Sequence, residues 1–543
     1  MKRAQRIRFA SISLASASFC VLVPAAIAQE RDDARQVPKI AFAPTLQIGR
    51  GFDPGTPQNA SDKEQIGAVL IRGNEGVADE RYQEVVEQFF GEPLTDEVLE
   101  RLSDELAQLA REEGYSYVRT DIDRNANGMG MVEISIDEGR VDAIEIEGYK
   151  NAQAERILSR LIGGPVRKQD LESALLLVSD IPAVRLRDAK LQRKGGRGVL
   201  VVKLSKRDNL YRVSGDNYGS ESFGPYRMRG TAQLRDVLTS SDVASLSIRI
   251  NPVDPDELLY LSGSYSTQLT SSGASWGVDG SIGNTSPGGQ IGNTEVEGDS
   301  LRLGTSITVP LLRGKNASLW FESRAEYISI EQDDLDQMLR DDTVVTLAAG
   351  LRTQFAVAGG QVRLGVSHLR GIDILGATRF GDPLASRRDG DGVFTKLDFW
   401  GDARFPLFDR VSMLLAAGGQ LADRPLLASE EIALGGAYRT RGYGFSEVLG
   451  DEGAYGLAEL RYSVPSKGIP FDFLQFYAFI DGGYVSDIDS TGSEGSLFSA
   501  GPGVRARIGK FDFEVESGFP LGGSGERDTG NEPEINVRAG INF

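Results

Sequence analysis

From about Asp208 to the C-terminus, the sequence loses helical periodicity and becomes a series of short alternating segments. Gly, Asn, Asp, Ser and Pro separate them, and most are about 9–12 residues long, the length that a tilted transmembrane β-strand needs. Examples are residues 258–268, 300–310, 317–330, 344–356, 361–369 and 394–405. In one of them the outward candidates, alternating with small or polar residues, are Leu301, Leu303, Thr305, Ile307 and Val309. The pattern predicts antiparallel strands that each present one apolar face.

The length of this region favours a single large membrane barrel. Dividing about 335 residues by about 20 per strand and connection gives 16 or 17 strands, and single bacterial chains favour even numbers, so we expect 16. A soluble propeller or several sandwiches is the alternative, but a soluble barrel of this size would need a packed core, and many of these strands offer only one apolar face. The chain also ends on an alternating segment whose last residue is Phe543, which fits a closing strand.

Composition excludes several other classes. No stretch after residue 28 approaches 18 consecutive apolar residues, which excludes a helical membrane protein. The net charge of -19 argues against a nucleic-acid binder. One cysteine (Cys20) and one histidine (His368) exclude a cysteine-ligated zinc site, and neither a nucleotide-binding P-loop nor a G-x-S-x-G nucleophile motif is present. We therefore predict no enzyme activity, no metal and no cofactor.

Residues 1–28 have the pattern of a secretory signal peptide. Four basic residues precede an apolar, small-residue stretch, and residues 26–28 (Ala-Ile-Ala) form a typical cleavage site. The protein is therefore expected to leave the cytoplasm of a bacterium. Residues 29–64 are polar and rich in proline, and we interpret them as a periplasmic linker.

Between this linker and the alternating region, two passes of the same β-α-α-β-β order predict tandem modules at residues 65–139 and 140–207. In the first, strands are expected at 69–71, 115–124 and 130–137 and helices at 81–90 and from Thr95, the predicted N-cap, to Gly114. In the second, strands are expected at 141–146, 184–192 and 198–204 and helices at 152–161 and 168–179. The polar run 123–128 imitates a calcium loop, but its twelfth position is Ile134, so a hairpin turn at Asn127-Gly128 is favoured.

Two motifs in the barrel region resemble one transporter family. Residues 430–436 (EEIALGG) followed by 438–443 (YRTRGY) are similar to the loop signature of two-partner secretion transporters. About 40 residues later, 479–483 (FIDGG) match the F-x-D-x-G strand motif of that family, and 216–219 (DNYG) resemble its first barrel strand. Residues 180–184 (DIPAV) resemble the end of the second helix of its second periplasmic module. The resemblance is to the TpsB class, the haemolysin secretion/activation (ShlB/FhaC/HecB) family of the BamA-like superfamily, and it covers residues 65–543.

The resemblance implies two periplasmic POTRA domains, an α+β part, followed by a 16-stranded transmembrane β-barrel at 208–543, located in the outer membrane. It also implies that the sixth extracellular loop, about 427–453, folds back into the barrel. Its tip would carry Arg441, Gly442 and Tyr443, and the facing strand would carry Phe479, Asp481 and Gly483. Because a guanidinium fork binds a carboxylate well in a partly desolvated lumen, Arg441 is expected to pair with Asp481, with Tyr443 and Phe479 beside them and Gly442 and Gly482 allowing close approach.

The family further implies a function in protein export. Its members pass an unfolded exoprotein, the TpsA-like client, from the periplasm to the cell surface without ATP. Exposed sheet edges of the POTRA domains suit capture of an extended client segment, to which the Arg-rich face of residues 185–197 is a possible contributor. Outer-membrane lipids and the barrel assembly machinery are the other expected partners. Nucleic acid is not expected to be a partner. The alternative is a BamA-like factor that assembles outer-membrane proteins. The acidic stretch 331–342 is interpreted as a solvated extracellular loop.

Overall fold

The computed structural model describes residues 65–123, 130–220, 224–286, 296–334, 337–488, 494–523 and 532–543. These residues divide into two compact units, which lie within residues 65–207 and Asp208–Phe543. The expected signal peptide (1–28), the linker (29–64) and the Asn127-Gly128 turn lie outside the described residues. Within the described ranges, no helix is both long enough and apolar enough to cross a membrane.

The first module has the predicted β-α-α-β-β order, in a three-stranded sheet with the strand order β1-β3-β2. Its elements are β1 (Ala68–Arg72), α3 (Asp79–Val86), the 3-10 turn η1 (Glu87–Phe89), α4 (Asp96–Glu112), β2 (Arg119–Asp123) and β3 (Met131–Asp137). The Thr95 hydroxyl caps α4 by accepting from the Val98 N–H, and the apolar side of α4 is buried against the sheet. The expected strand at 115–124 begins later, at Arg119, because Tyr115 and Val118 turn inward to the core.

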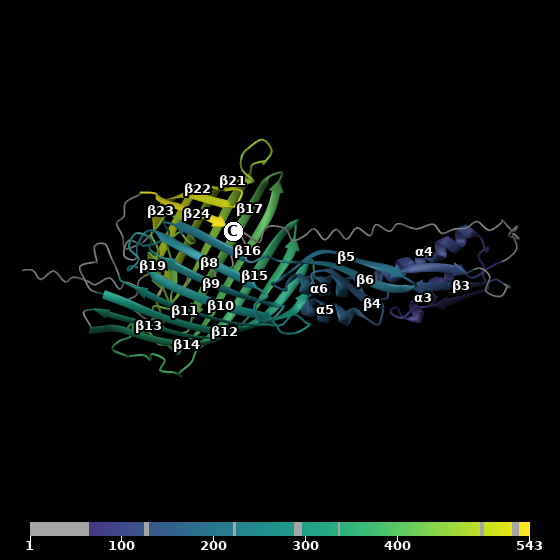
Figure 1. Cartoon of the computed structure of the whole chain (residues 1–543), viewed down its shortest axis with the longest axis horizontal. Coiled ribbons are helices and arrows are strands. Elements are labelled where there is room, and N and C mark those ends of the chain that lie inside the picture. The colour runs from purple at the N-terminus through teal and green to yellow at the C-terminus, as the bar shows by residue number, and fades with distance from the viewer. Residues whose placement is uncertain are drawn as a thin grey trace, which may run out of the picture. The chain divides into compact units, whose positions relative to one another are not determined.

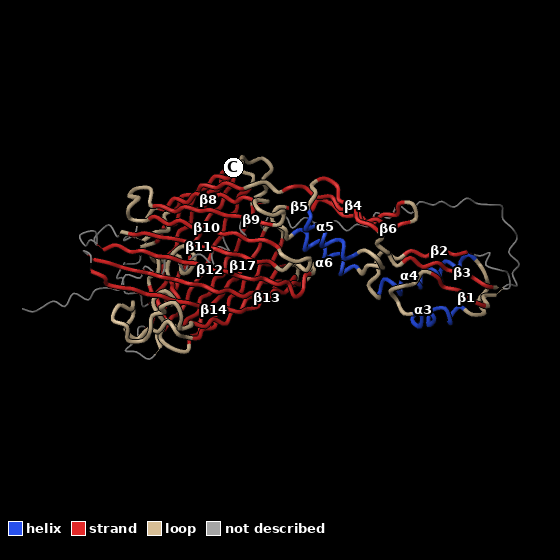
Figure 2. Tube along the Cα trace, turned by 60° about the horizontal axis from the view of Figure 1, so that its bottom comes forward, coloured by secondary structure: helices blue, strands red, loops and turns tan. Residues whose placement is uncertain are grey.

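The second module repeats this order, with strands arranged β4-β6-β5. Its elements are β4 (Ala143–Gly148), α5 (Ala152–Leu158), the 3-10 turn η2 (Ser159–Leu161), α6 (Lys168–Ser179), β5 (Val184–Lys194) and β6 (Arg197–Lys206). In both modules the central strand pairs in parallel with the first strand and antiparallel with the other, which leaves β1, β2, β4 and β5 as sheet edges. All helices among the described residues belong to these two modules (Figure 2).

The second unit is a closed barrel of 16 antiparallel strands, as predicted (Figure 1). The barrel strands are β7 (Leu210–Asp216), β8 (Arg227–Arg235), β9 (Asp242–Ile250), β10 (Leu259–Gln268), β11 (Ser275–Thr285), β12 (Val296–Arg313), β13 (Ala317–Asp334), β14 (Gln337–Val357), β15 (Gly360–Gly371), β16 (Thr395–Phe408), β17 (Val411–Ala422), β20 (Glu452–Ser463), β21 (Phe473–Ser486), β22 (Glu494–Ile508), β23 (Phe511–Gly523) and β24 (Glu534–Asn542). Two short strands, β18 (Ile432–Leu434) and β19 (Val448–Gly450), pair only with each other. Closure occurs where β24 pairs with β7.

Alternation along the strands separates an apolar outer face from a polar inner face. On β12, Leu301, Leu303 and Ile307 are exposed, whereas the intervening Arg302 is buried. The segment 331–342, expected to be a solvated loop, is instead mostly strand, because β13 and β14 continue to Asp334 and from Gln337. The buried ion pair of Arg340 with Asp342 belongs to this extension.

The chain path distinguishes the two ends of the barrel. β7 begins at one of them, and short turns such as 314–316, 358–359 and 409–410 lie at this same end. The long connections 372–394 and 423–451 lie at the opposite end, which the family resemblance predicts to face the cell surface and which we call the surface end. We refer to these two long connections as loop 5 and loop 6.

Candidate functional site

Loop 6, residues 423–451, connects β17 to β20 and folds back into the barrel. Its β18–β19 hairpin places Ile432 and Leu434 against Val485 and Leu497 of the barrel wall, and these four buried residues form a small apolar core. The loop tip that carries Arg441 lies beyond this hairpin. The observed range 423–451 overlaps the expected 427–453 and differs at both ends, because β17 ends at Ala422 and β20 begins at Glu452.

Arg441 is 3% exposed and contacts acidic side chains from three different strands of the inner wall. Its Nε donates to Asp481 Oδ2 at 2.8 Å, and Nη1 donates to Glu459 Oε2 at 3.2 Å and to Glu516 Oε2 at 3.1 Å. The carboxylate side chains are almost fully buried as well. One guanidinium therefore fixes the loop tip to β20, β21 and β23 together.

Aromatic side chains support this contact from the wall. The Arg441 guanidinium carbon lies 3.4 Å from the centre of the Phe479 ring, a cation–π geometry that gains strength in a desolvated site. Tyr477, two residues earlier on the same face of β21, donates its hydroxyl to Glu516 at 2.8 Å. The structure thus places Phe479 directly beneath the arginine.

Gly442 and Gly483 allow the backbone of loop 6 to lie close to the wall. A Cβ atom at Gly442 would meet Ser499, Phe519 and Pro520 within 2.9 Å, and one at Gly483 would meet Leu434 at 2.6 Å. Gly482, which we expected to face the loop, lies on the outer side beneath the Phe498 ring. Because successive strand residues point to opposite faces, it is the next residue, Gly483, that faces loop 6.

Tyr443 and Ser499 attach the tip to backbone and side-chain groups around the ion pair. The Tyr443 hydroxyl donates to the carbonyl oxygens of Phe498 at 3.2 Å and Gly522 at 2.8 Å. Ser499 accepts from the Gly442 N–H at 3.0 Å and donates to Asp481. Tyr443 therefore contacts the backbone of β22 and β23 rather than the Arg441–Asp481 pair.

Glu459, Glu516 and Ser499 were not predicted from the sequence. Alternation did carry a signal, because Glu459 and Glu516 occupy inward positions on strands whose outward residues, such as Leu460 and Val515, are apolar and exposed. An acidic residue at an inward position near the expected height of a buried arginine is a candidate partner. Further inward charges, Arg505 and Arg461, pair with Glu459 and extend the network along the wall.

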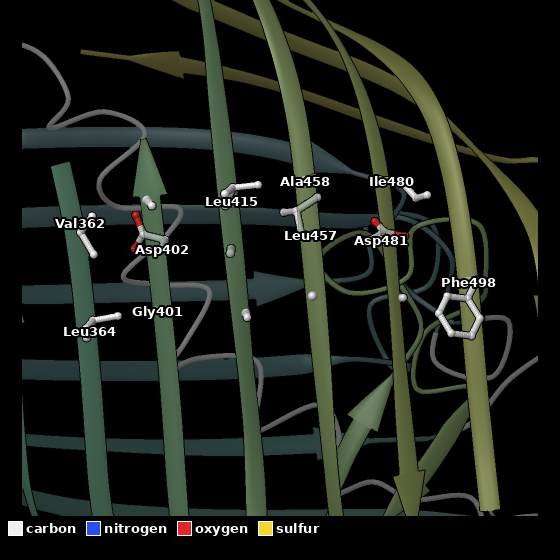
Figure 3. Close-up of a pocket in the computed structure, with 15 residues that line it drawn as sticks. Val362, Leu364, Gly401, Asp402, Leu415, Leu457, Ala458, Ile480, Asp481 and Phe498 are labelled. Carbon is white, nitrogen blue, oxygen red and sulfur yellow. The ribbon is translucent and has the colours of Figure 1, made fainter. Parts of the chain in front are cut away.

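The outer surface of this wall is apolar. Leu364, Leu415, Ile480 and Phe498 are all more than a third exposed and line a shallow hollow of about 650 Å³ (Figure 3). Asp481, directly after Ile480, is 5% exposed. Its carboxylate therefore belongs to the inner face, where loop 6 reaches it.

A second charged cluster lies at the surface end, at the base of loop 6. Glu431, Asp451 and Asp487 offer carboxylate oxygens within 4.8 Å of one another. The Arg387 guanidinium already lies among them, with Nη1 at 2.6 Å from Glu431 and 2.7 Å from Asp451. The position that a metal cation would take among these carboxylates is thus held by a side chain of the protein.

Comparison with known proteins gives a consistent set of relatives. Residues 196–506, more than half of the chain, match the family described as haemolysin secretion/activation protein ShlB/FhaC/HecB, and residues 64–139 match POTRA, a surface antigen variable number repeat. The chain is 23% identical over 424 residues to the heme/hemopexin transporter protein HuxB of Haemophilus influenzae, covering 73% of this chain and 72% of that protein. It is 23% identical over 446 residues to the outer membrane transporter CdiB of Dickeya dadantii, covering 78% and 77%.

Solved structures share the same architecture. CdiB from Escherichia coli superimposes with a TM-score of 0.78 over 99% of this chain and 100% of that one, at 19% sequence identity. BamA from Haemophilus ducreyi, lacking its POTRA domains 1–3, gives a TM-score of 0.50 over 88% and 99%, at 12% identity. At these identities the structures establish the fold, a barrel preceded by POTRA domains, and the likeness to BamA is the weaker of the two.

Proposed function

The chain belongs to the haemolysin secretion/activation (ShlB/FhaC/HecB) family of two-partner secretion transporters, and from this premise we propose that loop 6, fixed by Arg441, controls passage of a secreted client through its barrel. The protein is an outer-membrane transporter with its POTRA region in the periplasm. The observation that carries the proposal is the burial of Arg441 among Asp481, Glu459 and Glu516 inside the barrel.

This arrangement suits a reversible closure. Each charge of the Arg441 cluster is desolvated, and such a cluster is stable only while its partners stay together. Arrival of a client in the barrel would bring its own backbone and side chains into the lumen and compete for these groups. In the proposed cycle, the loop tip leaves the wall while the client passes and returns to the carboxylates afterwards.

We propose that the client is an unfolded exoprotein and that the POTRA edges receive it in the periplasm. Strands β2 and β5 are edges of their sheets, and an extended segment can add to such an edge through main-chain hydrogen bonds. On β5, the exposed residues Arg185, Arg187 and Lys190 add positive charge along this edge. Folding of the client at the cell surface would supply the free energy of transport. The outward apolar belt is proposed to contact outer-membrane lipids after insertion by the barrel assembly machinery.

The direct test is a comparative secretome of a deletion strain complemented with wild type, Arg441→Ala, Arg441→Lys or Asp481→Asn. Arg424→Ala is the control, because Arg424 is in the same loop but 45% of its side chain is exposed. We expect one large protein to disappear from the medium or cell surface on deletion and to return with wild type and Arg424→Ala. Arg441→Ala should fail to restore it. Asp481→Asn should reduce export less than Arg441→Ala does, since Arg441 keeps its contacts to Glu459 and Glu516.

Two results would contradict these proposals. If many outer-membrane proteins decrease together in the deletion strain, the protein acts in their assembly. If Arg441→Ala restores export fully while the barrel is inserted normally, loop 6 does not control passage through this contact.

Client capture is tested separately by photo-cross-linking from the periplasmic modules. A photoreactive residue at Lys190, exposed on the edge strand β5, is compared with one at Glu172, which lies on helix α6 and not on a sheet strand. We expect a cross-link to the exoprotein from position 190 and none from position 172. Equal cross-linking from both positions would refute capture at the edge.

A further inference from the structure

Loop 5, residues 372–394, is attached firmly to the long β14 strand at the surface end. Backbone bonds join the Asp341 N–H to the Leu384 carbonyl and the Thr378 N–H to the Thr343 carbonyl, both at 2.9 Å. The Ser386 N–H donates to the buried Asp342 carboxylate at 2.9 Å. The residue after Ser386 is Arg387, so these contacts to β14 help to fix the position of this arginine.

Arg387 reaches from loop 5 into the base of loop 6. Its Nη1 lies 2.6 Å from Glu431, which directly precedes β18, and 2.7 Å from Asp451, which directly follows β19. Asp451 also accepts the N–H groups of Leu426 at 2.7 Å and Ile488 at 2.9 Å. One guanidinium therefore joins both ends of the β18–β19 hairpin, whose tip carries Arg441.

Lys396 makes a second attachment to the same place. It lies at the surface end of β16 with a fully buried side chain, and its Nζ is 2.8 Å from Glu430 Oε2. Gln420 of β17 donates to the carbonyl oxygens of Glu430 at 2.8 Å and Asp451 at 3.0 Å. Glu430 and Glu431, adjacent in the sequence, are thus held by two different basic residues of the barrel.

From these contacts we infer that Arg387 and Lys396 are positioning residues for transport, which hold the base of loop 6 so that Arg441 stays on the inner wall. This inference rests on the proposed function of loop 6. According to this inference, loop 5 and the surface end of β14 hold the base of loop 6 in place while loop 6 is closed. When Arg387 is absent, Glu431, Asp451 and Asp487 remain close together without their central cation, and the hairpin loses the Arg387 contact at both of its ends.

The ionisation of Glu431 gives this attachment a pH dependence. The charged groups that face it are Arg387 of loop 5, Asp451 before β20 and Asp487 after β21. Burial raises the pKa of Glu431 to about 7, with the carboxylates of Asp451 and Asp487 adding to the rise and Arg387 opposing it. A carboxyl whose pKa is raised in the closed state favours closure while protonated and disfavours it as the pH rises through that pKa. Opening of the pore should therefore become more frequent as the pH rises from 5.5 to 8.5.

The test measures ion conductance of the purified full-length protein in planar lipid bilayers at pH 5.5 and pH 8.5. The variants are Arg387→Gln, Lys396→Gln, Glu431→Gln, Arg387→Gln with Glu431→Gln, and Arg441→Ala as the reference for a released tip. The matched control is Arg379→Gln, because Arg379 is in the same loop but is 53% exposed and pairs with Asp373 and Asp391 of its own loop. Heat-modifiable migration on gels verifies that each barrel is folded.

We expect Arg387→Gln and Lys396→Gln to raise the frequency of open events by at least about tenfold, since removing one partner of a buried pair leaves the other charge uncompensated. Glu431→Gln should abolish the pH dependence, and its combination with Arg387→Gln should return opening toward the wild-type level. Arg379→Gln should behave as wild type. If Arg441→Ala opens the pore but Arg387→Gln and Lys396→Gln keep wild-type conductance and pH dependence, the inference is wrong. If Arg441→Ala itself changes nothing, the proposed role of loop 6 fails first, and the inference fails with it.

Discussion

Glu138 and Arg441 are both buried charged residues that fix a loop, one in the first periplasmic module and one in the barrel. The Glu138 carboxylate accepts the N–H groups of Glu75, Gly76 and Val77 at 2.9, 2.5 and 3.0 Å. It also accepts the Tyr82 hydroxyl at 2.9 Å. Burial, together with the Glu138 charge, raises the pKa of Tyr82, so the hydroxyl remains protonated and donates. In both places a single buried side chain joins several polar groups that are themselves largely removed from water.

We expect Glu138→Ala to destabilise the first module by about 2–4 kcal/mol, because three backbone donors and one hydroxyl lose their acceptor. Glu133→Ala is the control, since Glu133 forms a solvent-accessible pair with Arg72. Urea unfolding of the full-length protein is followed by circular dichroism at about 222 nm, because helices in the described residues occur only in the two modules. Equal midpoints for the two variants would show that the carboxylate contributes little.

At the scale of elements, the barrel strands differ greatly in how much pairing holds them together. β13 and β14 pair over almost their whole length, from Ala317↔Phe355 to Asp334↔Gln337. The closing seam of β7 with β24 pairs only from Arg538↔Asp216 to Asn542↔Arg212. Arg212 reinforces this seam by a bidentate contact to Asp512, at 2.8 and 2.6 Å, and a bond to Asn542 at 2.9 Å. The seam is therefore the least supported junction in a wall whose other junctions have longer ladders.

A disulfide across this seam should raise the temperature at which the barrel opens. Gly215 and Ala539 are directly paired on the outer face, so the double variant Gly215→Cys and Ala539→Cys is suitable. The control joins Ser323→Cys with Ala349→Cys, a directly paired position in the long β13–β14 ladder. We expect oxidation to raise the transition of heat-modifiable migration by several degrees for the seam and little for the control. A comparable rise for both pairs would mean that opening does not begin at the seam.

At the scale of the whole molecule, the membrane position of the barrel follows from its outward apolar belt. Exposed apolar side chains occur on nearly every barrel strand, for example Leu246 (58%), Ile282 (55%), Leu303 (51%) and Ile480 (54%). In a water-soluble protein such exposure would favour aggregation, whereas in a bilayer it matches the hydrocarbon core. The inner face carries the charges, in ion pairs such as Arg302 with Glu326 and Arg363 with Asp402.

The adjacent residues Ser306 and Ile307 of β12 test this division because they lie on opposite faces. Ile307→Lys places a charge toward lipid and should destabilise the inserted barrel by about 2–4 kcal/mol. Ser306→Lys places the same charge toward the lumen and should destabilise the inserted barrel much less. Reversible folding into lipid vesicles, followed by the fluorescence of the three tryptophans, measures both. Equal costs would contradict the assignment of faces on this strand.

The sequence by itself determined the architecture, because it depends on local periodicity. Each module follows from apolar spacing, caps and turns, as the Thr95 cap of α4 illustrates. The number of barrel strands follows from segment length, and the 16 strands are confirmed. The lengths of β12, β13 and β14 were underestimated, since residues beyond the bilayer alternate less clearly and their pairing depends on neighbours.

The tertiary structure alone decided which inward residues meet. Arg441 lies 40 positions from Asp481 in the sequence, and the resemblance in motifs suggested that pair. Its contacts to Glu459 and Glu516, 18 and 75 positions away, depend on strand register and on the depth that loop 6 reaches. The same holds for Arg387 and Lys396, whose partners come from separate loops and strands. Alternation determines the face of a side chain, but only closure of the barrel brings faces of distant strands together, and desolvation there makes the charge pairs specific.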